Sequence, residues 1–258
     1  MFPPAEGGRE LLKKVFMKKI FLSILLLIYI NPNAFAEYSK ALELFNEKQY
    51  KESLDILGQD LIVADDYKPD SPNYKIRFLA AHNHWKLGNI DSASAHFRRC
   101  MAIDKSRVEP YIDIAIMYVE NGKLNDAVSV IEDGLKIKED PMLFWILGRT
   151  YYKKGNYPRA KELLEKANAM DPEFYFAYND LGIVLMKLKK YGDANAAFTV
   201  ALAIQPDSAE INYNTAQSLL MMGKNNEAKD YAKRALELDP NNESIKNLNK
   251  KIEETKNN

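Results

Sequence analysis

Apolar and small residues recur along this chain with a period of about 34 residues. Aligning the sequence from residues 74, 108, 141, 175 and 209 gives five segments separated by 34, 33, 34 and 34 residues. Each segment contains two helical stretches with a turn between them. We number the positions within each segment from its first residue. The pattern predicts an all-α protein made of repeated helical hairpins.

Three positions of the repeat hold only small side chains. Positions 8, 20 and 27 carry Ala, Gly or Cys in all five segments, whereas composition alone would place so small a residue at roughly one position in five. Helices approach closely where the facing side chains are small, so these positions predict helix crossings. They are Ala81, Ala115, Gly148, Gly182 and Ala216 at position 8, Ala93, Ala127, Ala160, Ala194 and Ala228 at position 20, and Cys100, Gly134, Ala167, Ala201 and Ala235 at position 27.

Glycine and proline mark the ends of the predicted helices. Position 15 is Gly in four segments, where Gly accepts the left-handed conformation that closes a helix, and Lys189 is the exception. Position 32 is Pro in the last three segments and ends the second helix. The glycines are Gly88, Gly122, Gly155 and Gly223, and the prolines are Pro172, Pro206 and Pro240.

This motif resembles the tetratricopeptide repeat. The resemblance rests on the helix-turn-helix unit with Leu147-Gly148, Tyr151, Gly155-Asn156-Tyr157, Ala160, Ala167 and Pro172, and it covers residues 74–242. It implies an all-α, right-handed helical-hairpin solenoid. The five predicted repeats are 74–107, 108–140, 141–174, 175–208 and 209–242. Residues 37–73 resemble a degenerate first repeat followed by a connector, and residues 243–258 predict a C-terminal capping helix with Ile245, Leu248 and Ile252 on one stripe.

Residues 1–36 are predicted to direct export. Lys18 and Lys19 precede an apolar run of 11 residues from Ile20 to Ile30, and Ala34-Phe35-Ala36 follows a Pro-containing break. This is the pattern of a secretory signal peptide that starts at Met17 and is cleaved before Glu37, since the run is shorter than a bilayer span. We therefore expect a periplasmic protein, with secretion as the alternative, and an uncleaved anchor is the weaker reading of this segment.

Charge and composition exclude several partner classes. The chain has 36 basic and 36 acidic residues, and residues 1–36 contribute five bases and two acids, so the remainder is slightly acidic at 31 against 34. Without a basic patch, nucleic acid and anionic lipid are poor partners. The single cysteine, Cys100, excludes an internal disulfide and lies at a small packing position, which favours a buried thiol.

The resemblance implies that the first helix of each repeat lines a concave groove. Positions 2, 5, 9, 12 and 13 would face this groove, and they form an unusually apolar and aromatic set that also includes Glu210. For Ile112, Ile116 and Ile183, packing against the next repeat is an equally good interpretation. The candidate partner-binding residues are Lys75, Phe78, His82, Trp85, Ile112, Ile116, Met142, Trp145, Arg149, Tyr152, Lys153, Phe176, Asn179, Ile183, Tyr213 and Gln217.

The chemistry of these positions suggests the kind of partner. Trp145 and Tyr152 share one helix face and are predicted to be surplus to packing, with Arg149 between them. Aromatic anchors beside bases suit a peptide with apolar and acidic groups. Some members of the family hold a terminal carboxylate with Lys and Asn at positions 5 and 9, but Phe78 and His82 stand there in the first regular repeat, which disfavours that mode.

No motif predicts catalysis, a cofactor or a metal. His82 and His84 are two residues apart and so face different sides of a helix, and His96 belongs to the second helix. Phosphate loops, nucleophile elbows and paired-carboxylate motifs are missing from the sequence. The preferred hypothesis is a non-enzymatic protein-interaction scaffold or adaptor of the bacterial envelope. The alternatives are a glycan-binding module that stacks sugars on Trp85, Trp145, Tyr152 and Tyr213, and a self-associating structural protein.

Overall fold

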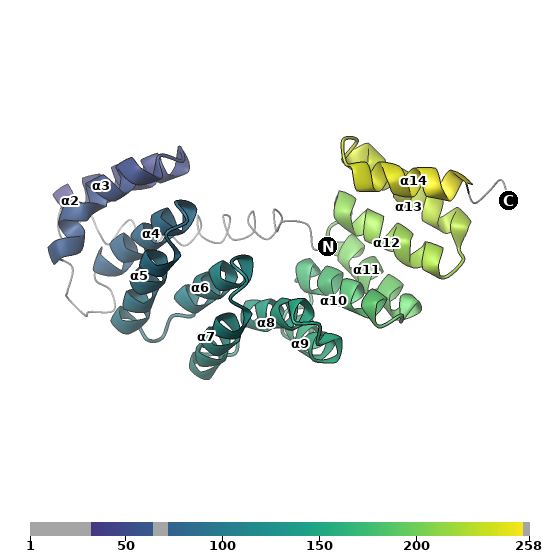
Figure 1. Ribbon diagram of the computed structural model, residues 1–258, viewed down its shortest axis with the longest axis horizontal. Coiled ribbons are helices and arrows are strands. Elements are labelled where there is room, and N and C mark those ends of the chain that lie inside the picture. Colours follow the sequence, from purple (N-terminus) through teal and green to yellow (C-terminus); the bar gives the residue numbers. More distant parts are fainter. Residues whose placement is uncertain (1–31, 64–71, 255–258) are drawn as a thin grey trace. The chain divides into compact units, whose positions relative to one another are not determined.

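The computed structural model describes residues 32–63 and 72–254, which form α-helices and no strand within those ranges (Figure 1). The chain divides between Asn121 and Gly122 into two compact units. The first unit contains α2 (Pro32–Asn46), α3 (Tyr50–Val63), α4 (Pro72–Lys86), α5 (Ile90–Ile103) and α6 (Glu109–Glu120). The second contains α7 (Leu124–Ile137), α8 (Pro141–Lys153), α9 (Tyr157–Met170), α10 (Tyr175–Lys187), α11 (Tyr191–Ile204), α12 (Ala209–Met221), α13 (Asn225–Leu238) and α14 (Glu243–Glu254).

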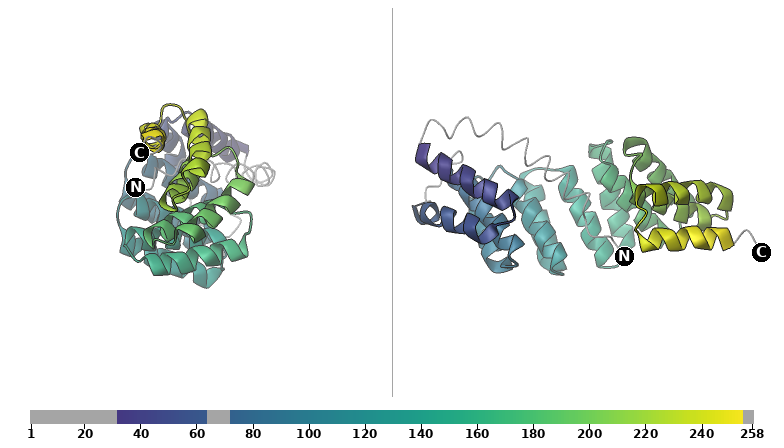
Figure 2. Two further views of the ribbon diagram at one scale, coloured as in Figure 1. Left: turned by 90° about the vertical axis from the view of Figure 1, so that its right-hand side faces the viewer. Right: turned by 90° about the horizontal axis from the view of Figure 1, so that it is seen from above.

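Consecutive helices pack as antiparallel hairpins within each unit. In the first unit α2 packs on α3 and α4 on α5, and in the second α8 packs on α9, α10 on α11 and α12 on α13. The two further views show the same pairing of neighbouring helices (Figure 2). The sequence prediction of an all-α helical-repeat solenoid is therefore confirmed.

The small repeat positions are the places where helices meet. All fifteen residues at positions 8, 20 and 27 are buried. At Gly148 a β-carbon would lie 2.8 Å from Cγ of Leu164, and at Gly182 it would lie 2.6 Å from Cδ1 of Phe198. Because Leu164 and Phe198 occupy the equivalent position 24 in successive repeats, the same crossing recurs along the second unit.

Position 15 ends the first helix of each repeat in a left-handed turn. Gly88, Gly122, Gly155 and Gly223 have φ between 73° and 78°, and Lys189 adopts φ of 60° at the same position. The amide of the residue after Lys189 donates to the carbonyl of Leu185 at 2.9 Å, which closes a Schellman motif. The turn geometry is thus kept even where the sequence lacks glycine.

The first helices of successive repeats line the inner side of the second unit's stack. Helix α8 contacts α10, α10 contacts α12, and α12 contacts α14. These direct contacts between first helices fit the concave side that the resemblance assigns to them, so we take α8, α10 and α12 as the concave side of the second unit.

The ends of the described chain add two details. Helix α2 begins at Pro32, so the predicted cleavage site before Glu37 lies inside it, whereas the predicted signal core Ile20–Ile30 lies outside the described residues. At the other end, Ile245, Leu248 and Ile252 of α14 are buried, and the last two pack with α12 and α13 residues.

Across residues 32–63 and 72–254, none of the helices combines the length and apolar character that crossing a bilayer requires.

Candidate functional site

The predicted groove residues divide between the two units, and each set is described within its own unit. In the first unit Phe78, His82 and Trp85 form an aromatic cluster with the buried Phe97. The His82 ring is 4.9 Å from that of Phe78 and 5.8 Å from that of Trp85, and its Nε2 lies 3.1 Å from Oδ2 of Asp113. These side chains therefore hold α4 to α5 and α6.

The other predicted residues of the first unit are mixed in exposure. Ile112 is buried, while Ile116 and Lys75 are half-buried. Burial, together with the nearby Arg107 guanidinium, lowers the pKa of Lys75 to about 8. Of the two interpretations for Ile112, packing against the next repeat or a role in the groove, its burial favours packing.

Trp145 in the second unit is part of the core, and the expectation that it is surplus to packing is wrong. Only 4% of Trp145 is exposed. Its ring contacts Phe174 and Phe176, and its indole N–H donates to Oδ2 of Asp180 at 2.6 Å. Since a sugar ring needs an exposed aromatic face, Trp145 is also unsuited to the glycan-stacking role.

Arg149 is held by the next repeat. Its Nε lies 3.4 Å from Oδ2 of Asp180, and its guanidinium lies 4.9 Å from the centre of the Trp145 ring. Burial raises the pKa of Asp180, and the Arg149 charge and the Trp145 hydrogen bond oppose that rise. A buried carboxylate requires such partners, so the main role of the Arg149 charge is to compensate the charge of Asp180.

Half-buried side chains from three consecutive first helices remain on the concave side of the second unit. We call this set the inner face. It comprises Arg149, Tyr152 and the exposed Lys153 from α8, Phe176, Ile183 and the buried Asn179 from α10, and Tyr213, Asn214, Gln217 and the exposed Glu210 from α12. Met142, also predicted, is half-buried near the start of α8.

Hydrogen bonds connect α10 to α12 across the inner face. Asn179 Nδ2 donates to Oε1 of Glu210 at 3.1 Å, and Asn214 Nδ2 donates to Oδ1 of Asn179 at 3.0 Å. Gln217 donates to the Tyr213 hydroxyl at 2.6 Å. Protein atoms around Glu210 and the nearby Asp180 carboxylate raise the pKa of Glu210, although its side chain reaches solvent.

Sequence reasoning missed Asp180 and Asn214, which lie at position 6 of their repeats. The same position carries Asp113, which pairs with His82 of the preceding repeat. Position 6 is apolar in the first and third repeats, where it is Leu79 and Ile146. A polar residue at this otherwise apolar position is the signal that could have identified them.

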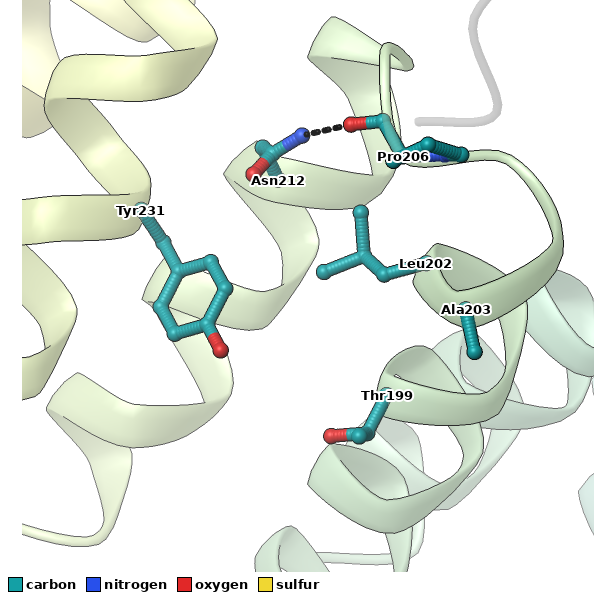
Figure 3. Close-up of a pocket in the computed structure, with 6 residues that line it drawn as sticks. All are labelled: Thr199, Leu202, Ala203, Pro206, Asn212 and Tyr231. Carbon is teal, nitrogen blue, oxygen red and sulfur yellow. Dashed lines mark hydrogen bonds between the residues drawn. The ribbon is translucent and has the colours of Figure 1, made fainter.

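A separate apolar cleft lies on the second-helix side of the second unit. It has a volume of about 380 Å³ and is lined by Thr199, Leu202, Ala203, Pro206, Asn212 and Tyr231. Figure 3 shows Tyr231 of α13 facing the α11 residues, with an Asn212 amide donating to the carbonyl of Pro206 at 3.2 Å. None of the predicted partner-binding residues contributes to it.

Histidines 84 and 96 form a stacked pair between α4 and α5. Their rings are 5.3 Å apart with an interplanar angle of 13°. Burial, with the charges of His84 and Arg77, lowers the pKa of His96 to about 4. Within the described ranges, His, Cys, Asp and Glu form no group of three or more that could hold a metal ion. The Cys100 thiol is buried, as its repeat position predicts.

Comparisons with known proteins identify the repeat family. Residues 34–257 match the family model of the cilia and flagella-associated protein 70 C-terminal domain, a tetratricopeptide-repeat domain. The chain is 24% identical over 241 residues to a CTR9 homologue of Arabidopsis thaliana, covering 76% of this chain and 22% of the relative. The chain spans between about a fifth and a half of the length of the first curated relatives it matches.

Solved structures share the fold at low sequence identity. The type IV pilus biogenesis factor PilW matches with a TM-score of 0.67 and 16% identity, over 84% of this chain and 99% of PilW. YrrB, described as a tetratricopeptide-repeat protein with an unusual peptide-binding site, matches with a TM-score of 0.55 and 19% identity, over 70% of this chain and 93% of YrrB. These likenesses show the fold alone.

Proposed function

Because the chain belongs to the tetratricopeptide-repeat family of the cilia and flagella-associated protein 70 C-terminal domain, we propose that it is a non-enzymatic scaffold that binds a protein segment on the inner face. Proteins with this fold generally mediate protein–protein interactions and bind peptides. The inner face carries the proposal, since Tyr152, Phe176 and Tyr213 are half-buried aromatics on three consecutive first helices. Such rigid, partly exposed rings are the usual anchors of protein binding.

The location that we propose for this scaffold is the bacterial envelope. It is supported by the signal-like pattern from Met17 to Ala36. The partner is a protein or peptide, and no cofactor is required for this role. Self-association remains the second outcome of the binding test, because a second copy of the chain is also a protein partner.

The binding test uses a random dodecapeptide phage library selected on the purified full chain. Selected peptides are synthesised, and their affinity for variants is measured by fluorescence anisotropy. Tyr152→Ala with Tyr213→Ala should weaken binding by at least about tenfold, as loss of aromatic anchors does. The control is Tyr231→Ala, which removes a half-buried tyrosine from the cleft of Figure 3 and should leave affinity unchanged.

Three results would overturn the proposal. The first is that no peptide is selected, the second is that Tyr231→Ala weakens binding while the inner-face variant does not, and the third is that the chain binds only itself. Urea unfolding of each variant separates a loss of binding from a loss of fold. Tyr152 and Tyr213 are only half-buried, so their removal should reduce stability less than a core cavity would.

A further inference from the structure

Arg149, the base that the sequence suggests for binding an acidic partner group, already interacts with residues of the second unit. Arg149 lies beside the buried Asp180 and over the ring of Trp145. Releasing Arg149 to a partner's carboxylate would leave the Asp180 carboxylate buried with less compensation, which is as unfavourable as breaking a buried ion pair. An acidic partner group therefore gains little at this point of the inner face.

Glu210 is the carboxylate of this region that faces solvent, and the nearest cation acting on it is Arg149, which already lies beside Asp180. No Lys or Arg forms an ion pair with it among the described residues. Lys153 and Lys187 are at position 13 of their repeats, at the other end of the first helix from Glu210 at position 2. Eleven residues of helix correspond to about 16 Å, which is longer than the Debye length of about 8 Å, so these lysines do little to compensate the Glu210 charge. This part of the inner face therefore holds two carboxylates, Asp180 and Glu210, and one guanidinium, that of Arg149, so negative charge is in excess.

The hydrogen bonds around Glu210 leave acceptors rather than donors for a ligand. The amide of Asn214 donates to Asn179, and the amide of Asn179 donates in turn to one oxygen of Glu210. The other carboxylate oxygen of Glu210 and the side-chain oxygen of Asn214 accept no protein hydrogen bond in the described ranges. Two acceptors on neighbouring turns of α12 match the forked N–H donors of a guanidinium.

Aromatic side chains flank these acceptors. Phe176 lies one helical turn from Asn179 on α10, and Tyr213 lies one turn from Glu210 on α12, so each ring shares a face with a polar neighbour. Both rings are half-buried. An arginine side chain can pack its methylene stem and its guanidinium face on such rings while its N–H groups reach the carboxylate.

We propose that Glu210 and Asn214, positioned through Asn179 and flanked by Phe176 and Tyr213, form a subsite for an arginine side chain of the bound segment. This subsite rests on the proposed function, and it reverses the charge of the partner group that the sequence alone suggests. Binding of arginine would compensate the excess negative charge of the Asp180 and Glu210 pair. Lysine fits less well, because its compact ammonium cannot reach both acceptors in one plane.

The experiment uses the peptides selected from the dodecapeptide library on the full chain. We expect arginine to be enriched in them at one aligned position, and replacement of that arginine by glutamine should weaken binding about tenfold, the size of a charge-assisted hydrogen-bond pair. In the Glu210→Gln variant the same peptide change should alter affinity by less than about twofold. Glu162→Gln, an equal charge change on exposed Glu162 of α9, should retain the full effect.

The outcomes separate this inference from the function on which it rests. If no peptide is selected, both are overturned. If peptides bind but show no arginine preference, or if the preference persists in Glu210→Gln, the arginine subsite is overturned and peptide binding stands. Because Glu210 is exposed, the variant should fold, and Asn214→Ala provides a second test at the other acceptor.

Discussion

Adding a single methyl group at Gly182 tests the helix crossing on which each repeat depends. The β-carbon of an alanine would lie 2.6 Å from both Cδ1 and Cζ of Phe198, far inside van der Waals contact. The Phe198 ring is fully buried and cannot swing into solvent. Either α10 and α11 must separate or the ring must leave its preferred position.

Two opposing effects set the magnitude. Replacing glycine by alanine inside a helix stabilises it by about 0.5 to 1 kcal/mol. Overpacking a tight core costs about 1 to 3 kcal/mol. The difference between the two ranges is a net loss of about 0 to 2.5 kcal/mol, and we expect Gly182→Ala to lower the free energy of unfolding by about 1 kcal/mol. Gly148→Ala should be milder, because the atoms it meets belong to the flexible side chain of Leu164.

Urea unfolding monitored by circular dichroism measures these changes. The matched control is Gly192→Ala in the first turn of α11, where a β-carbon would meet no atom within 4 Å. This control should gain about 0.5 kcal/mol, since only the helix-propensity effect operates. Equal stabilisation by Gly182→Ala and Gly192→Ala would refute the close crossing at repeat position 8.

Three further predictions concern the turns, the histidine pair and the N-terminus. Lys189→Gly should raise the free energy of unfolding by about 1 kcal/mol in urea titration by relieving a positive φ, whereas Lys190→Gly, at the following residue, should not. His96 has a folded-state pKa of about 4, below its unfolded value, so stability should fall as pH drops from about 6.5 through 4. His96→Leu should remove about 1 to 2 kcal/mol of that acid sensitivity, a figure reduced because solvent screens the half-buried ring, and urea unfolding at both pH values measures it. An unchanged dependence of the free energy of unfolding on pH would contradict the desolvation of His96. Intact mass of the protein from its native host should begin at Glu37, and retention of Ile20–Ile30 would contradict cleavage.

The repeat architecture is readable from the sequence because it depends on side-chain size at fixed intervals. Only small residues leave room for the helix crossings at positions 8, 20 and 27, so the same side-chain sizes recur at fixed intervals in the five repeats. The left-handed turn at position 15 is less strict. Lys189 adopts it because the Schellman hydrogen bonds and the packing of α10 on α11 outweigh the strain of a positive φ.

The sequence predicts which residues lie on the inner face better than it predicts which of them are buried. Helical position predicts that Tyr152 and Tyr213 share one side, but it does not reveal what the following repeat brings against them. Trp145 illustrates the difference: Phe174 and Phe176 pack against its ring, and Asp180, 35 residues later, accepts its indole N–H. Contacts between repeats depend on the spacing of helices in three dimensions, so the burial of Trp145 and the pairing of Arg149 required the structure.

Site-specific photo-crosslinking of a selected peptide decides whether the inner face is the binding surface. Benzoylphenylalanine is placed at position 213 on the inner face or at position 231 in the cleft of Figure 3. After irradiation, mass spectrometry detects the covalent adduct between the chain and the peptide. Binding on the inner face predicts an adduct from position 213 and none from position 231. An adduct from position 231 alone would contradict it.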